Sequence, residues 1–166
     1  MPIQIRPLLV HESALVSEVA RRMRRTLQHV LGDDAGAALY GLDWLEDRVR
    51  FHLDPTRCRG EVFLAFGSDV LVGHCIVRVE ATETASYGLF STTWVEPGHR
   101  RAGIARALLD AGEAWLRAHG QSRLVTDTAT DNLPLQELFM ARGYRIVLHS
   151  EDGRMVRLAR DLEPAS

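Results

Sequence analysis

Residues 86 to 128 contain two strand-like runs separated by an amphipathic helix, and this order constrains the fold more than any other feature. The first run, Ser86–Val95, is rich in aromatic and β-branched residues, and the second is Leu124–Thr128. Between them, apolar residues recur on one helical face: Ile104, Ala105, Leu108, Leu109, Trp115 and Leu116. Two strands joined in this way by a helix pair in parallel. The segment therefore predicts a parallel pair of strands within a sheet.

The N-terminal third predicts one short strand and two helices. Ile3 and Ile5 alternate with polar residues in a strand that ends at Pro7. A first helix begins at Ser13, and Gly32-Asp33-Asp34 stops it; its apolar stripe is Val16, Val19, Met23, Leu27 and Val30. A second helix ends before Pro55, with its own stripe of Leu42, Leu45, Val49 and Leu53. The run of arginines from 21 to 25 stands mostly off the first stripe and is interpreted as surface.

The middle of the chain predicts an antiparallel meander. Glu61–Phe66 and Val70–Val79 are apolar runs joined by a turn at Gly67-Ser68-Asp69. The run Ser86–Val95 follows after a second short turn. Three sequential strands with short turns pair in antiparallel order.

The C-terminal part adds a helix and a last hairpin. Asn132 is a candidate N-cap for a helix over Leu133–Arg142 that Gly143 closes. Tyr144–His149 and Arg154–Ala159 form the hairpin. The whole chain thus predicts a mixed α/β (α+β) sheet with helices packed on it.

Length and composition predict a single domain, residues 1–166. With 166 residues, of which 46% are hydrophobic, the chain can form one core. Its formal net charge of -2 argues against general attraction to nucleic acid or to anionic membranes. Neither a signal-peptide core nor a membrane-spanning stretch is present in the sequence, so a cytoplasmic location is expected.

The two cysteines, Cys58 and Cys75, allow one disulfide, but reduced and partly buried thiols are the favoured interpretation. Neither cysteine is surrounded by side chains at metal-ligand spacing. We therefore expect no metal.

The turn between Val95 and Ala105 predicts an anion-binding site. It is basic, it contains Pro97-Gly98, and it runs directly into the amphipathic helix, whose N-terminus presents free N–H groups. Gly103 would allow close approach of a phosphate, since it has no Cβ. Many helices begin with Gly and Arg after a turn, so a purely structural role is the alternative. The stretch is neither a P-loop nor a Rossmann fingerprint.

Its spacing resembles a known motif. Arg100-x-x-Gly103-x-Ala105, after Val95-x-Pro97, resembles the pyrophosphate-binding motif of the GNAT superfamily, the acetyl-CoA-dependent N-acetyltransferases. Asn132 to Tyr144 resembles the second motif of that superfamily, an Asn that opens a helix ending in Gly-aromatic. The order of elements over residues 3–159 also fits. The resemblance implies about seven strands, mostly antiparallel, four main helices, and central strands splayed around CoA.

The resemblance also implies the residues that bind acetyl-CoA. Pantetheine would pair with the strand end at Thr93, Trp94 and Val95, and the Val95 backbone N–H would polarise the thioester. Asn132 would contact pantetheine near the thioester, or would serve as a plain N-cap, or both. The pyrophosphate would lie on N–H groups of the turn: Arg100, Arg101, Ala102, Gly103, Ile104, Ala105 and Arg106. Phe139 stands at this cofactor site where many relatives carry a Tyr that protonates the thiolate, which a phenyl ring cannot do.

Several residues are candidates for the general base. Asp127, on the strand that leads to Asn132, is the first choice, because its side chain points opposite to its threonine neighbours. Glu83 is a second candidate, with a solvated turn residue as its alternative interpretation. His74 is interpreted as a core histidine. Tyr144 matches an aromatic residue that packs in the core.

The resemblance further implies that the region from about Leu15 to Leu53 would shape the acceptor pocket. It contains acidic and aromatic residues that could attract a cationic amine or form an ordinary solvated face: Tyr40, Asp43, Trp44, Glu46 and Asp47. The resulting hypothesis is an N-acetyltransferase that transfers an acetyl group to a primary amine of a small molecule or peptide, by direct attack in a ternary complex. The alternatives are a CoA-binding protein with little or no catalysis and a binder of another phosphate metabolite. A homodimer is expected because related proteins often pair.

Overall fold

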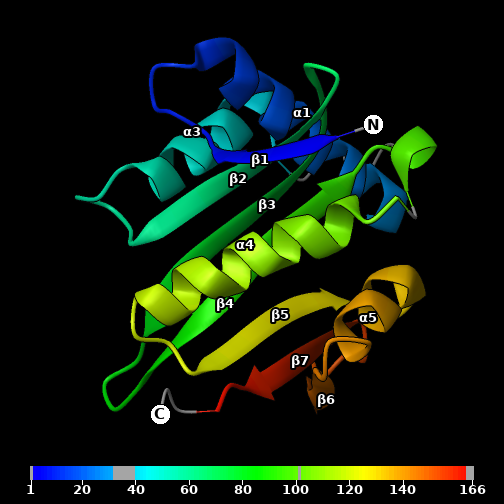
Figure 1. Ribbon diagram of the computed structural model, residues 1–166. Coiled ribbons are helices and arrows are strands. Elements are labelled where there is room, and N and C mark those ends of the chain that lie inside the picture. The colour runs from blue at the N-terminus through cyan, green and yellow to red at the C-terminus, as the bar shows by residue number, and fades with distance from the viewer. Residues whose placement is uncertain (1, 32–39, 101, 164–166) are drawn as a thin grey trace.

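The computed structural model describes residues 2–31, 40–100 and 102–163 (Figure 1). Its strands are β1 Ile3–Pro7, β2 Gly60–Gly67, β3 Val70–Ala81, β4 Ser86–Val95, β5 Arg123–Ala129, β6 Arg145–His149 and β7 Met155–Asp161. Its α-helices are α1 Ser13–Leu31, α3 Leu42–Leu53, α4 Ile104–Ala118 and α5 Leu133–Met140, and a 3-10 turn covers Pro97–His99.

The strands form one sheet in the order β1-β2-β3-β4-β5-β7-β6. Neighbouring strands are antiparallel, with β4 and β5 as the parallel pair. Helix α4 joins those two strands, as the crossover pattern predicts. Within the described ranges, seven strands and four α-helices confirm the expected mixed, mostly antiparallel fold.

Strands β4 and β5 pair only at their beginnings. The parallel pairing comprises Gly88 with Leu124, Leu89 with Val125, and Phe90 with Thr126. Beyond Phe90, β4 continues to Val95 while β5 turns away from it (Figure 1). We call this diverging region the splay. It leaves the second half of β4 without a strand partner on its β5 side among the described residues.

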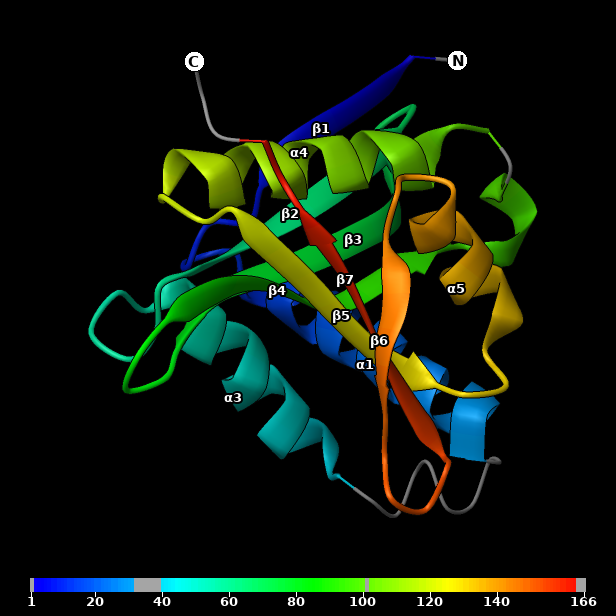
Figure 2. The same cartoon turned by 90° about the horizontal axis from the view of Figure 1, so that it is seen from below.

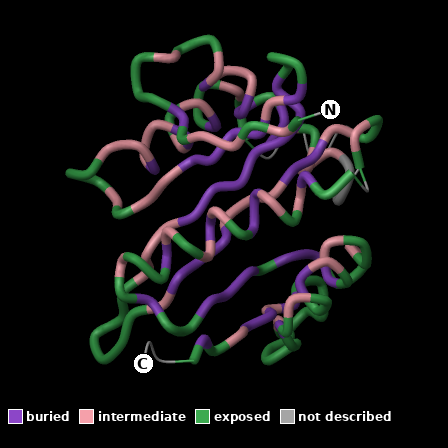
Figure 3. The backbone as a smooth tube through the Cα atoms, viewed as in Figure 1, coloured by how far each residue is buried: buried purple, intermediate pink, exposed green. Residues whose placement is uncertain are grey.

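The sheet separates two hydrophobic cores. Figure 2 shows α4 on one face and α1 with α3 on the other. Neighbouring residues of β3 serve opposite cores, because Cys75 packs toward α4 and Ile76 toward α1 and α3. Buried residues, drawn purple in Figure 3, run along the central strands. Both Cys58 and Cys75 are free, with Cys75 buried and Cys58 half-buried, in agreement with the favoured interpretation.

Some boundaries differ from the sequence prediction. Helix α5 ends at Met140 rather than at Arg142, and the chain turns through Gly143 at φ +92°. Asn132 occupies the N-cap position, but its side chain does not cap the helix; its Nδ2 donates to Thr128 Oγ1 at 3.1 Å. The predicted stop at Gly32-Asp33-Asp34 lies outside the described residues. No described helix is both long and apolar enough to cross a bilayer.

Candidate functional site

The N-terminus of α4 is open to an anion. Gly103 precedes the helix at φ +80°, a left-handed conformation that favours glycine, and a Cβ there would meet no atom within 4 Å. No described side chain caps this end. The N–H groups of the first turn, through Arg106, lack intrahelical acceptors and can bind an anion together with the helix dipole. Arg101 lies outside the described residues.

The Arg100 side chain folds back onto the end of β4. Its Nε donates to Val95 O at 3.0 Å, and its guanidinium lies 5.2 Å from the centre of the Trp94 ring. Its backbone N–H donates to Pro97 O at 3.4 Å. The predicted anion site therefore narrows to the N–H groups after Arg100, because the N–H of Arg100 already has an acceptor.

The backbone groups of Thr93 and Val95 point into the splay. On the β3 side, Glu96 N donates to Val72 O at 2.8 Å, which makes these two residues a hydrogen-bonded pair. Such pairs alternate along an antiparallel ladder, so Thr93 and Val95 direct their N–H and C=O groups away from β3. The backbone of Trp94 points toward β3, which corrects the expectation that it binds pantetheine.

A bulge in β4 decides which side chains flank the splay. Thr92 pairs with Ile76 and Phe90 with Val77, so Ser91 is the extra residue. Because Ile76 packs against α1 and α3, the Thr92 side chain lies on that face. Phe90 belongs to the α4 core.

Asp127 lies on the same face as Thr92, across the splay. It follows Thr126, the last β5 residue paired with β4, and its carboxylate accepts from Arg157 Nε at 2.8 Å and from Arg157 Nη2 at 3.0 Å. This pair raises the pKa of Arg157, with the Asp127 hydrogen bond as the main cause. Asp127 thus lies beside the splay, but its carboxylate is held in an ion pair with Arg157.

The structure does not bring Glu83 to the splay. Glu83 lies exposed in the turn before β4, and the paired section of β4 separates it from Thr92. Ser86 and Val95, the two ends of β4, are about 30 Å apart at the usual rise per residue. The distance along the strand is the physical reason that Glu83 does not fit the role of a base near Val95.

Phe139 lies in the core rather than at the cofactor site. It is 0% exposed, and its ring packs edge-on against Phe90 and Tyr144. Tyr144 is also buried, and its hydroxyl donates to Glu113 Oε1 at 3.1 Å. Burial raises the pKa of Tyr144. The expected contact of Phe139 with the cofactor is therefore corrected, because a completely buried ring has no ligand-facing surface.

The acceptor region presents exposed aromatic and acidic groups. The rings of Tyr40 and Trp44 stack with their centres 4.0 Å apart, and both side chains are exposed. Asp43 lies in the first turn of α3, whereas Asp47 is paired with Arg57 at 3.0 Å. Residues 32–39, which precede Tyr40, lie outside the described residues.

One interaction near the site was not anticipated from the sequence. Arg22, placed on the surface by its charge, is only 7% exposed. Its Nε donates to Glu96 at 2.8 Å and its Nη2 to Leu71 O at 2.9 Å, which ties α1 to the start of the turn predicted to bind an anion. The available signal was position, because Arg22 follows Val19 by three residues and so adjoins the buried stripe.

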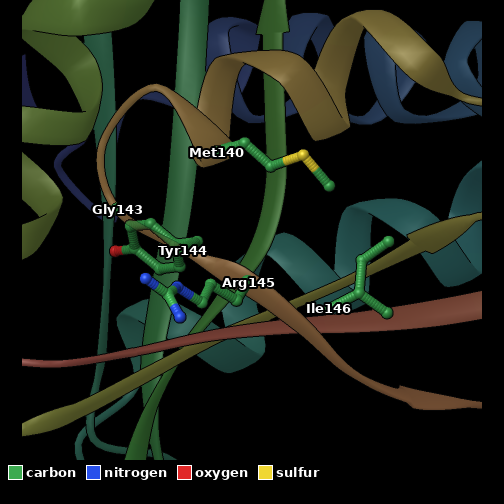
Figure 4. A pocket seen from close by; sticks show the side chains of 5 residues that line it. All are labelled: Met140, Gly143, Tyr144, Arg145 and Ile146. Atoms are coloured by element: carbon green, nitrogen blue, oxygen red, sulfur yellow. The ribbon is translucent and has the colours of Figure 1, made fainter.

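A pocket elsewhere on the molecule is separate from the splay and from the α4 N-terminus. It measures about 430 Å³ and lies between the end of α5 and the start of β6 (Figure 4). Its lining is Met140, Gly143, Tyr144, Arg145 and Ile146. Within the described residues there is no cluster of three or more His, Cys, Asp or Glu side chains arranged to hold a metal ion.

Comparisons with known proteins bear on the same region. The sequence profile described as the Acetyltransferase (GNAT) family matches residues 33–144. An aminoglycoside N(6')-acetyltransferase type 1 of Stenotrophomonas maltophilia is 32% identical over 113 residues, which are 64% of this chain and 71% of that protein. A protein of the same description from Acinetobacter haemolyticus is 30% identical over 67 residues, 40% of this chain and 46% of that protein.

Solved structures share the fold. An acetyltransferase from Thermus thermophilus has a TM-score of 0.73 and 20% identity, with 98% of each chain covered. The PaiA N-acetyltransferase from Thermoplasma acidophilum, solved in complex with coenzyme A, has a TM-score of 0.67 and 16% identity, with 97% of this chain and 99% of that chain covered.

Proposed function

This chain belongs to the acetyltransferase (GNAT) family, and we propose from that premise that it transfers an acetyl group from acetyl-CoA to a primary amine of a small molecule or peptide. Membership makes it an acyltransferase. The acceptor, the residues that act and the extent of the domain, residues 1–166, belong to the proposal. The homodimer and the cytoplasmic location stay predictions.

One observation carries the proposal: the splay ends at an uncapped helix N-terminus. Gly103 provides an open left-handed turn before α4, and a short segment of β4 beside it directs backbone groups away from β3; of these, the Val95 carbonyl accepts from Arg100 Nε. These residues fit a diphosphate attached to an amide-containing arm. The N–H groups from Ala102 to Arg106 would hold the diphosphate. Thr93 and Val95 would bind the pantetheine amides, and Asn132 would approach them from the start of α5.

Thr93 and Val95 also provide the donors that acyl transfer needs. The bound donor supplies a thioester carbonyl, whose oxygen gains negative charge during attack. A backbone N–H aimed at that oxygen stabilises the charge without having to reorganise. We assign this role to Val95 N–H, with Thr93 N–H one pair deeper in the splay.

The amine would enter from the face that carries Asp127. An ammonium must lose a proton before its nitrogen can attack a carbonyl carbon. The Asp127 carboxylate lies beside the splay, where it would attract the ammonium. It would also order a water that takes the proton. Arg157 donates two hydrogen bonds to this carboxylate, at 2.8 and 3.0 Å, and so fixes its orientation beside the splay.

Replacement of Asp127 by Asn tests this assignment. We expect the acetylation rate at neutral pH to fall about tenfold or more, because a neutral amide neither attracts an ammonium nor accepts its proton. CoA affinity should change much less. A variant with an unaltered pH–rate profile would remove Asp127 from the mechanism.

The proposed function is tested by thiol release. Acetyl-CoA is incubated with the protein and a panel of amines, and free CoA thiol is measured. Aminoglycosides come first because the relative with 32% identity is an aminoglycoside N(6')-acetyltransferase, followed by polyamines, amino acids and peptides. We expect release above background with at least one amine.

A CoA-binding protein with little catalysis is the second candidate. The buried Phe139, which has no hydroxyl, and the ion-paired Asp127 favour it. CoA binding measured by calorimetry together with no thiol release for any amine would establish this candidate and contradict the first.

A further inference from the structure

A threonine hydroxyl beside the splay is hydrogen-bonded to a buried histidine. Thr92 lies two residues beyond the last β4 residue that pairs with β5, and it is half-buried. Its Oγ1 is 3.1 Å from Nε2 of His74, whose side chain is 0% exposed. The two residues lie on neighbouring strands, on the face of α1 and α3.

The imidazole is neutral, and its surroundings favour one tautomer. Burial, with a smaller contribution from Arg22, lowers the pKa of His74 to about 3. No described group bonds its buried Nδ1. A buried N–H without an acceptor is rarer and costlier than an acceptor without a donor, so the proton resides on Nε2. Nε2–H then donates to Thr92 Oγ1, and the Thr92 hydroxyl hydrogen is left to point elsewhere.

The other threonine and tyrosine hydroxyls near the splay contact groups other than His74. Thr93 points to the α4 face and contacts Cys75 Sγ at 3.9 Å, and Thr126 donates to Phe90 O at 3.2 Å. Thr128 accepts from Asn132. Tyr144, the aromatic hydroxyl of the second motif, is engaged by Glu113. Of these hydroxyls, that of Thr92 lies on the α1 and α3 face of β4, where His74 contacts its oxygen; Ser91, in the bulge, is the neighbouring hydroxyl on the strand.

We propose that Thr92 donates a hydrogen bond to the sulfur of the departing CoA, and that His74 is the positioning residue that orients it. This inference rests on the proposed function. The amine nitrogen forms a bond to the thioester carbon, the carbon–sulfur bond breaks, and sulfur leaves with the electron pair as a thiolate. The amine proton goes to water, and the thiolate later takes a proton from water. Thr92 keeps its own proton throughout and stabilises the negative sulfur, a task that Phe139 cannot perform.

Titration of the thiol of bound CoA tests the hydrogen bond without turnover. Thiolate absorbance of the CoA complex is followed against pH, with the absorbance of the protein alone subtracted. Thr92→Val should raise the pKa of the bound CoA thiol by about one unit, because a hydrogen bond to a charged group is lost. Thr92→Ser should restore the wild-type titration. Ser86→Ala, a hydroxyl deletion at the far end of β4, is the matched control and should leave it unchanged.

The acetylation rates of the same variants should change in parallel with the pKa of the bound thiol. Thr92→Val should lower kcat about tenfold or more, with the CoA Kd unchanged within about twofold. His74→Leu should lower kcat in the wild-type background but not further in the Thr92→Val background, because the two residues act as one unit. His74→Gln, which retains a donor, should recover part of the rate. Thermal unfolding of each variant shows whether it is folded.

The possible outcomes distinguish a failure of the roles of Thr92 and His74 from a failure of the proposed function. A wild-type titration in Thr92→Val, or a shift caused by Ser91→Ala instead, overturns the role of Thr92. Equal losses from His74→Leu in both backgrounds overturn the role of His74. A wild-type protein that binds CoA but releases no thiol with any amine contradicts the proposed function and removes this inference with it.

Discussion

At the scale of single residues, Gly103 and Gly120 give a comparison within one helix. They flank α4 with nearly the same φ, +80° and +81°, and a Cβ at either would meet no atom within 4 Å. The two glycines therefore differ in what lies beside them: the splay at Gly103 and ordinary solvent at the C-terminal turn of Gly120. Backbone strain and ligand approach can thus be measured separately.

Gly103→Val should weaken CoA binding by more than about tenfold, since a branched side chain would occupy the space that a phosphate needs. Gly120→Val should leave the CoA Kd unchanged. Both variants should lose about 1 kcal/mol of stability from the left-handed backbone. Calorimetric titration and denaturant unfolding measure the two effects, and equal CoA affinity in both variants would contradict the assigned diphosphate site.

Glu12, just before α1, provides a pH-dependent contribution to stability. Its carboxylate accepts two hydrogen bonds from Arg6, each at 2.8 Å, and Arg6 is the main reason that its pKa falls to about 2. A carboxyl with a lowered folded-state pKa stabilises the fold above its unfolded-state pKa, and this contribution disappears as the pH falls through the folded value. Glu12→Gln should therefore be less stable than wild type at neutral pH, with a gap that closes between about pH 4.5 and 2. A gap that stays constant over this range in urea titrations would contradict the pairing.

Some residue positions could be predicted from the local sequence, and others could not. The glycine of the turn and the core position of Tyr144 follow from local motifs and are found in the structure. The burial of Phe139 and the ion pair of Asp127 with Arg157 depend on contacts between distant segments. The partner of Thr92 is likewise set by strand register and by a bulge, which a single sequence does not encode locally.

At the scale of elements, α1 and the turn between β4 and α4 are joined by the ion pair of Arg22 and Glu96. The Arg22 side chain is 9% exposed, so its positive charge is compensated by Glu96 and the Leu71 carbonyl rather than by water. Strand and helix positions were largely predictable because alternation and helical period are local. The extent of the splay was not, since it depends on where two strands far apart in sequence stop pairing.

Glu96→Ala should cost about 3 kcal/mol of unfolding free energy, because it leaves a buried guanidinium without its counter-charge. Asp161→Ala is the matched control: it removes the exposed partner of Arg123 and should cost less than about 1 kcal/mol. Chemical denaturation measures both. Similar small losses in the two variants would show that the Arg22 pair does not hold α1 to the turn.

At the scale of the whole molecule, one sheet serves both cores and the site. The cores on its two faces share β2 and β3, so neither face can unfold without exposing the other. The donor would bind where α4 begins, and the acceptor would approach from the face of α1 and α3. The two substrates would thus meet at the splay from opposite sides of one continuous sheet.

Unfolding should therefore be a single transition. Far-UV circular dichroism and tryptophan fluorescence should report the same midpoint, whereas two separated midpoints would contradict a single domain. CoA at about 100 times its Kd should add about 2.7 kcal/mol of stability, which raises Tm by about 5 to 10 °C.

The splay and the α4 N-terminus together would form the acetyl-CoA site. A crystal structure of the protein with CoA tests it most directly. We expect the diphosphate on the N–H groups between Ala102 and Arg106, the pantetheine arm between β4 and β5 along Thr93 and Val95, and the thiol near Thr92. A diphosphate bound elsewhere, or CoA bound with its arm outside the splay, would contradict it.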